Sequence, residues 1–169
     1  MKKDISFEEA CLYIQSLPYK RNQNKSNINC VLLDKGGTCS TKHAFLKDFA
    51  NRHGMSQVKL MLGIFVMNAR NTPKVARVLN NYGLEEMPEA HNYLRINHQI
   101  HDYTRPASKR EDFENDLLVE IEIEPDQIVD FKVNFHKNFL AGYLSVSKIT
   151  FTLDEFWAIR EECIEALQQ

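Results

Sequence analysis

The stretch from Val58 to Met67 has an apolar residue at nearly every position, and it limits the possible folds of this chain more than any other segment. A run of about eight to ten such residues is typical of a β-strand buried on both faces, because a strand with one solvated face alternates apolar and polar side chains. The chain has 169 residues, which fits one domain and is enough for a hydrophobic core. We therefore expect a single domain, over residues 1–169, with this strand in its interior.

Both ends of the chain carry the signature of a helix start. Ser6 and Glu9, and again Thr152 and Glu155, are spaced as capping boxes, in which each side chain satisfies a backbone amide at the helix terminus. An apolar stripe with helical spacing follows each capping box, and Pro18 ends the first one. These patterns predict one helix near the N-terminus and another that closes the chain.

The segments between these helices complete an α+β prediction. Pro73 suits the first turn of a helix that ends at Tyr82-Gly83. Residues 117–124 alternate between aliphatic residues and glutamates, which is typical of a strand with one solvated, acidic face. Residues 126–144 fit either a strand or a helix, and their length and the preceding Pro125 favour the helix.

A β-hairpin is predicted between His91 and Thr104. Residues 91–96 and 100–104 are rich in aromatic and β-branched side chains, and Asn97-His98 between them suits a tight connection. Residues 84–89 before the hairpin and the charged residues 107–115 after it are interpreted as surface loops.

The charge balance argues against several classes of partner. With 21 basic and 23 acidic residues the net charge is −2, which gives no basic surface for nucleic acid or an anionic membrane. No apolar run approaches the roughly 20 residues that span a bilayer. The N-terminal residues 1–5 lack the apolar segment of a signal peptide. We therefore expect a cytoplasmic protein without a nucleic-acid or membrane partner.

Cys39 is distinguished from the other cysteines by its position. Cys11, Cys30 and Cys163 lie far from it, no C-x-x-C pair occurs, and free thiols are expected in a chain without an export signal. Gly36-Gly37 allows a sharp turn before Cys39. Thr38 suits the N-cap of a helix that follows, and the Cys39 thiol would then lie in its first turn. Unpaired amides and the positive end of the helix dipole favour a thiolate there. The alternative is a small buried hydrophobic residue.

His91 and Asp102 supply a base and an orienting group for such a nucleophile. In a hairpin with a two- or four-residue connection, positions whose numbers sum to an odd value lie on the same face. Because 91 and 102 sum to an odd number, we expect the imidazole to bond the carboxylate through one nitrogen and to reach Cys39 with the other.

Three short motifs resemble the core of the transglutaminase-like superfamily: Gly37-Thr38-Cys39 at a helix start, His91-Asn92-Tyr93 on one strand, and Asp102-Tyr103-Thr104 after it. The resemblance covers roughly residues 28–105. It implies a papain-like α+β scaffold, in which the cysteine helix packs against an antiparallel sheet with flanking helices.

The resemblance also implies an activity. Cys39 would be the nucleophile, His91 the general base and acid, and Asp102 the orienting carboxylate, in a reaction that passes through a thioester and needs no cofactor. Thr38 and Ser40 stand where the animal crosslinking transglutaminases carry Gln and Trp. The expected relatives are therefore small bacterial-type members, and the expected chemistry is hydrolysis or acyl transfer on a peptide or protein amide.

The oxyanion of such a reaction needs hydrogen-bond donors. The backbone N–H of Cys39 is one candidate, because it lies at a helix start. The polar loop before the cysteine offers further candidates for the oxyanion or the substrate: Tyr19, Arg21, Asn22 and Asn24. The alternative for this loop is a solvated connection.

Two other functions compete with this reading. The first is a metal site. His98 and His101 are spaced so that they point to opposite faces of a strand, which is poor geometry for binding one metal ion. His43 is expected on the flank of the cysteine helix, and we therefore expect no metal site. The second alternative is a catalytically silent binding or interaction module on the same scaffold.

Overall fold

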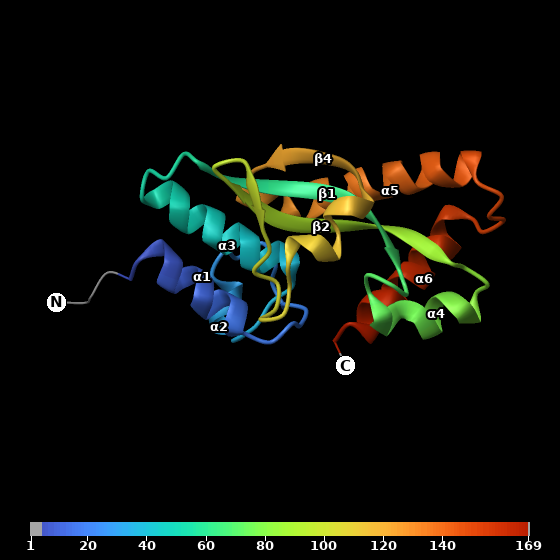
Figure 1. Ribbon diagram of the computed structural model, residues 1–169, viewed down its shortest axis with the longest axis horizontal. Coiled ribbons are helices and arrows are strands. Elements are labelled where there is room, and N and C mark those ends of the chain that lie inside the picture. The colour runs from blue at the N-terminus through green and yellow to red at the C-terminus, as the bar shows by residue number, and fades with distance from the viewer. Residues whose placement is uncertain (1–4, 169) are drawn as a thin grey trace.

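The structure is a computed structural model, and it describes residues 5–168. Its centre is a four-stranded antiparallel sheet with the strand order β3-β2-β1-β4. Strand β1 (Val58–Asn68) lies between β2 (Glu86–Ile96) and the edge strand β4 (Leu117–Ile123), and β3 (Gln99–His101) pairs with β2 (Figure 1). The α+β prediction is therefore confirmed at the level of the class.

Strand β1 separates two hydrophobic cores, as its continuous apolar sequence predicted. The even-numbered Leu60, Leu62 and Ile64 are fully buried in a core that includes residues of two helices, α1 (Phe7–Ser16) and α3 (Cys39–Arg52). The odd-numbered Met61 and Phe65 belong to a second core, which includes residues of α4 (Ala76–Asn81) and α6 (Leu153–Ala166). Burial on both faces explains why this strand shows no polar alternation.

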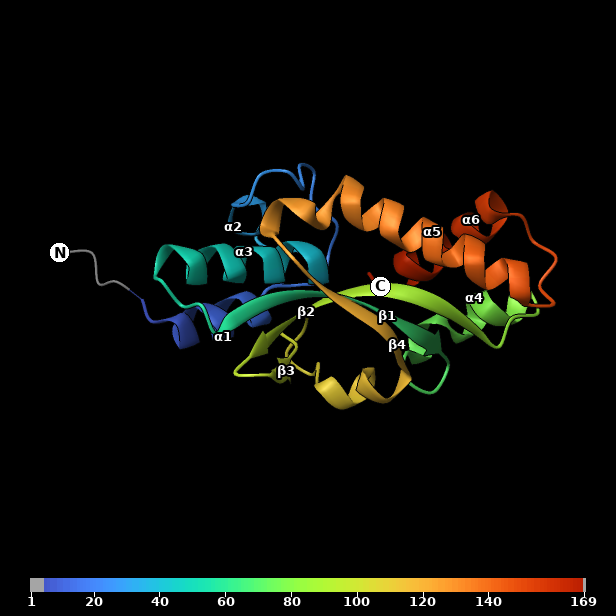
Figure 2. The same ribbon diagram turned by 90° about the horizontal axis from the view of Figure 1, so that it is seen from above.

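In the described part of the chain, six α-helices accompany the sheet: α1 (Phe7–Ser16), α2 (Cys30–Leu33), α3 (Cys39–Arg52), α4 (Ala76–Asn81), α5 (Asp130–Val146) and α6 (Leu153–Ala166). Figure 2 shows α3 and α5 over one face of the sheet, and the short turns of residues 110–116 under the other. The capping boxes predicted at Ser6 and Thr152 are both present. The predicted helix after Pro73 is also confirmed, since a 3₁₀ turn over Pro73–Val75 leads into α4.

Residues 126–144 are helical. A 3₁₀ helix, Pro125–Ile128, leads into α5, as the proline and the length of the segment suggested. The inward face of α5 carries Lys132, His136 and Leu140, which are spaced four residues apart and are all buried. Two polar side chains therefore occupy most of the covered face of this helix.

The hairpin is confirmed with the two-residue connection that was predicted. Ile96 pairs with Gln99, and Asn97 and His98 both have positive φ angles, of 48° and 70°. Such a connection matches the twist of the flanking strands. The predicted loop over residues 84–89 is wrong in part, because β2 begins at Glu86 and residues 86–89 pair with β1.

The charged segment 107–115 is not merely a surface loop. It forms two 3₁₀ turns, Arg110–Asp112 and Glu114–Asp116, and the side chain of Phe113 is only 2% exposed. The Phe113 ring packs against Phe65 and Tyr93 beneath the sheet. One buried aromatic residue thus fixes an otherwise polar segment to the core.

Two glutamates on the acidic face of β4 form ion pairs with cations of β1 and β2. Glu120 accepts from Arg95 at 2.6 Å, and Glu122 pairs with Lys59 at 2.7 Å.

Within residues 5–168, no helix is both long enough and apolar enough to cross a membrane.

Candidate active site

The two glycines before Cys39 let the chain approach its neighbours closely. Gly37 forms a short parallel bridge with Tyr19, and its amide donates to the Pro18 carbonyl at 3.1 Å. A Cβ at Gly37 would lie 2.6 Å from Oγ1 of Thr41 and would force a displacement. This packing delivers Cys39 to the first position of α3, as predicted, with Thr38 at the N-cap position.

The imidazole of His91 and the carboxylate of Asp102 are in direct contact. Nε2 of His91 lies 3.0 Å from Oδ2 of Asp102, and it must carry the proton because the ionised carboxylate can only accept. The other oxygen, Oδ1, accepts from the backbone amide of Thr104 at 2.9 Å and from its hydroxyl at 2.5 Å. These bonds fix the carboxylate, and they leave Nδ1 of His91 free for another partner.

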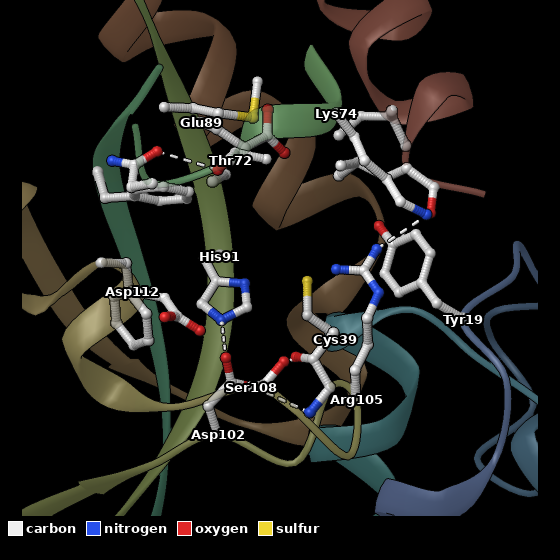
Figure 3. A pocket seen from close by; sticks show the side chains of 18 of the residues that line it. Tyr19, Cys39, Thr72, Lys74, Glu89, His91, Asp102, Arg105, Ser108 and Asp112 are labelled. Atoms are coloured by element: carbon white, nitrogen blue, oxygen red, sulfur yellow. Dashed lines mark hydrogen bonds and ion pairs between the residues drawn. The ribbon is translucent and has the colours of Figure 1, made fainter. Parts of the chain in front are cut away.

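Cys39 lies on the other side of the His91 ring from Asp102. Figure 3 shows its sulfur pointing into the cavity, beside the imidazole edge that carries the free nitrogen. The structure therefore brings together the three side chains selected from the sequence. Asp102 reaches His91 from just beyond the end of β3 and not from within a paired strand.

The charges of this group favour a thiolate and an imidazolium. Burial by itself would raise the pKa of Cys39, but the positive charges of Lys132 and His91, with hydrogen bonds from His91 and the Asn92 backbone, lower it to about 6. Burial would likewise lower the pKa of His91, but the negative charges of Asp102 and Cys39 raise it to about 10. Asp102 has a pKa well below its usual range, because the effect of His91 outweighs burial.

Lys132 of α5 is the second cation beside the sulfur. Its side chain is buried, and Nζ lies 3.9 Å from Sγ of Cys39. Nζ also donates to Oγ of Ser40 and to Oδ1 of Asn92, both at 2.8 Å. The amide nitrogen of Asn92 donates in turn to the Met61 carbonyl at 2.9 Å, so the lysine is anchored to the sheet.

His43 is fully buried behind the site and not on the flank of α3, where the sequence placed it. Its Nε2 accepts from the backbone amide of Tyr103 at 2.8 Å, so Nδ1 must carry the proton that bonds the Cys39 carbonyl at 2.7 Å. Burial is the main reason that its pKa falls to about 4, although nearby Asp102 opposes this. A neutral imidazole therefore joins the cysteine helix to the segment that carries Asp102.

Two cavities meet at Cys39. The larger, of about 270 Å³, lies on the His91 side and has apolar walls that include Phe65 and Phe113. The smaller, of about 170 Å³, lies on the Lys132 side. Both are lined by Tyr19, Cys39, Glu89 and Ile164, so the sulfur stands at the boundary between them.

Of the four loop residues selected from the sequence, Tyr19 and Arg21 reach the cavities. Tyr19 lines both of them, with the Arg105 guanidinium 4.1 Å above its ring. Arg21 lines the smaller cavity from the rim, where it pairs with Glu161 at 2.5 Å.

The structure does not bring Asn22 and Asn24 to the sulfur, because neither residue lines a cavity. The amide nitrogen of Asn22 donates to Asp34 and to the Gly36 carbonyl, both at 2.8 Å, and its oxygen accepts from Thr41 at 2.6 Å. Asn22 thus supports the glycine turn and has no donor left for an oxyanion. Asn24 is exposed.

No family model, curated protein or solved structure matches the chain. The case for its function therefore depends on the site itself. Among residues 5–168, no three His, Cys, Asp or Glu side chains are grouped so that they could hold a metal ion.

Sequence reasoning missed three charged residues that line the smaller cavity: Lys132 and Glu89, which are buried, and Arg160, which is partly buried. Glu89 and Arg160 form a bidentate ion pair at 2.5 and 2.8 Å between the two cavities. The weak signal for Lys132 was its spacing from His136 and Leu140 on one helix face. That signal gains meaning only once α5 is seen to pack beside α3.

Proposed function

We propose that this protein is a cysteine-dependent acyltransferase or hydrolase of peptide or protein amides, with a transglutaminase-like arrangement of catalytic residues. One observation carries the proposal: the Cys39 sulfur lies beside an imidazole whose other nitrogen donates to a fixed carboxylate. The packing of the cysteine helix α3 against β2 of an antiparallel sheet supports the relation to this superfamily.

The reaction begins with attack of the Cys39 thiolate on the substrate carbonyl. A carbon–sulfur bond forms, and the tetrahedral intermediate collapses when the carbon–nitrogen bond breaks. The His91 imidazolium gives its proton to the departing amine, which leaves a thioester on Cys39 and a neutral imidazole. Water or a second amine then attacks the thioester and gives a proton to neutral His91, and the carbon–sulfur bond breaks to release the Cys39 thiolate.

The other residues prepare this step. Asp102 fixes the His91 tautomer and stabilises the protonated, imidazolium form of the ring. The backbone amide of Cys39, in the first turn of α3, is the donor proposed for the negative charge that develops on the carbonyl oxygen. The apolar walls of the larger cavity keep bulk water from the imidazole and give the amine side of the substrate a place to bind.

An activated ester tests the proposal, because it acylates a reactive thiol without requiring the natural substrate. Incubation with p-nitrophenyl acetate is expected to give a burst of nitrophenolate equal to the enzyme concentration, with one acetyl group on Cys39 by peptide mass analysis. Cys39→Ser and His91→Ala are expected to abolish the burst. Asp102→Asn is expected to slow it.

The remaining cysteines are internal controls. Cys11, Cys30 and Cys163 are buried free thiols, and burial raises the pKa of each, to about 12 for Cys11 and about 11 for Cys163. They should stay unmodified while Cys39 reacts. Acetylation of Cys39 no faster than that of Cys11 or Cys163 would instead support a binding or interaction module.

A further inference from the structure

The smaller cavity on the Lys132 side has an unusual charge balance. Its walls carry four cations, Arg21, Lys25, Lys132 and Arg160, against two carboxylates, Glu89 and Glu161. Both carboxylates already form ion pairs with the two arginines, at N–O distances between 2.5 and 2.8 Å. The lysines are therefore the charges of this cavity that protein carboxylates do not neutralise.

Lys132 is the more consequential of the two lysines because it is buried. Its Nζ has three N–H donors, of which two bond the neutral oxygens of Ser40 and Asn92. No carboxylate among residues 5–168 forms an ion pair with it, and Glu89, whose charge raises the pKa of Lys132, is paired with Arg160. The anion that lies within reach of Nζ is the Cys39 thiolate, 3.9 Å away.

Acylation of Cys39 removes this anion. The thioester sulfur carries no charge, so a protonated Lys132 then lacks a counterion, and burial, which already lowers the pKa of this lysine, favours loss of its proton unless another anion is bound. A buried charge without a partner is costly, and a partner supplied by the substrate stabilises the intermediate. The part of the substrate bonded to the sulfur is the part that lies close enough to supply it.

We propose that the smaller cavity is the acyl-group subsite and that it binds an acyl group bearing a carboxylate, with Lys132 as the counterion. This inference rests on the function proposed above. An acyl group ending in an aspartyl or glutamyl residue has the required chemistry, since its carboxylate lies a few bonds from the thioester carbon. The aromatic ring of Trp157 offers a wall for the aliphatic part of such a group.

Two alkylating reagents of nearly equal size isolate the charge effect. Iodoacetate and iodoacetamide both form a carbon–sulfur bond to the thiolate and release iodide, but only iodoacetate places a carboxylate next to the sulfur. We define the charge preference as the ratio of the iodoacetate rate to the iodoacetamide rate, divided by the same ratio for glutathione. For Cys39 of the full chain we expect a preference of about tenfold or more, because a unit charge about 4 Å away in a partly desolvated site has an effect of at least this order.

Variants identify the cation responsible for the preference. Lys132→Met and Lys132→Gln are expected to reduce the preference at least to the glutathione value. Lys148→Met, the same substitution at an exposed lysine beyond the end of α5 and outside both cavities, is expected to retain it. If neither Lys132 variant folds, a structure of carboxymethylated wild-type protein replaces them, and the new carboxylate should lie within hydrogen-bond distance of Nζ.

The outcomes separate the two proposals. Fast reaction of Cys39 with iodoacetamide and no preference for iodoacetate would overturn the acyl-group subsite and leave the proposed function intact. Slow reaction with both reagents, at the rate of Cys11, would overturn the proposed function itself. A preference that survives in Lys132→Met, or a carboxymethyl group turned into the larger cavity, would also contradict the subsite.

Discussion

His43 joins the Cys39 carbonyl to the chain beside Asp102 through a neutral imidazole. Nδ1 donates to the Cys39 oxygen at 2.7 Å, and Nε2 accepts from the Tyr103 amide at 2.8 Å. The ring therefore holds the nucleophile's helix and the carboxylate's loop in a fixed relative position. Protonation of Nε2 would place a second donor against the Tyr103 amide, so the connection depends on a neutral ring.

We predict that His43 makes the fold sensitive to mild acid. Burial lowers its folded-state pKa to about 4, below the ordinary value of about 6.5. Between these values the unfolded chain binds a proton that the folded chain does not, so the free energy of unfolding falls as the pH falls, by up to ~1.4 kcal/mol per pH unit. Urea unfolding between pH 7 and about pH 4 should show a shallower loss in His43→Gln. Parallel curves for the two proteins would contradict the assignment.

The reactivity of Cys39 should persist well below the range of an ordinary thiol. Because its pKa is lowered to about 6, the iodoacetamide rate is expected to rise through about pH 6 and to be constant above neutral pH. His91→Asn removes one of the two cations that stabilise the thiolate, so the midpoint should move up by about one unit or more. The rate is measured by intact-protein mass at each pH. An unchanged midpoint in the variant would show that the imidazole does not act on the sulfur.

Asp102 is expected to control the charge of His91. The carboxylate raises the pKa of His91 to about 10, so the wild-type ring should stay protonated at pH 8. Asp102→Asn preserves the size of the side chain but removes its charge, and the pKa of His91 should fall by about two units or more. Ring-nitrogen chemical shifts followed by NMR report this titration directly. A ring that titrates identically in the two proteins would exclude Asp102 as its partner.

Gly37, two residues before Cys39, is predicted not to tolerate a side chain. In Gly37→Ala the new Cβ meets Thr41 Oγ1 at 2.6 Å and a Val31 methyl group at 2.8 Å, and overpacking of this kind costs about 1–3 kcal/mol. Thermal unfolding measures the loss. Gly142→Ala is the matched control, because its Cβ would meet nothing within 4 Å and alanine stabilises a helix interior by roughly 0.5–1 kcal/mol. Equal effects of the two substitutions would refute the close packing at Gly37.

The ion pair between Glu89 and Arg160 should be costly to break from one side. Arg160→Met leaves a buried carboxylate without its partner, and such a change typically costs about 3–5 kcal/mol. In the double variant with Glu89→Gln no uncompensated charge remains, so part of the stability should return. Chemical unfolding of the wild type and the three variants gives the coupling energy. Additive losses would mean that the two side chains do not act as a pair.

The local elements of this chain were predictable because their signals are local. The capping boxes, the apolar run of β1 and the Asn97-His98 turn each depend on residues a few positions apart. The placement of His91 and Asp102 on one side of the hairpin followed from the same kind of pattern. The contact itself also needs the turn at Thr104, which holds the carboxylate outside the strand.

The sequence predictions were wrong or incomplete where contacts with distant segments of the chain decide whether a residue is buried. Glutamates and a proline made residues 84–89 look like a loop, yet Arg160 of α6 neutralises Glu89 and makes a buried strand position possible. Phe113 stands alone among charged residues, and its burial depends on the core of β1 and β2. Lys132 was not selected from the sequence, because no local pattern reveals that α5 covers the sulfur.

The origin of Lys132 and Arg160 in the C-terminal helices has a consequence for biosynthesis. The segments that carry Cys39, His91 and Asp102 leave the ribosome first, when the sulfur still lacks the lysine charge and one wall of its smaller cavity. The charge of Lys132 therefore acts on the sulfur only once α5 has packed beside α3.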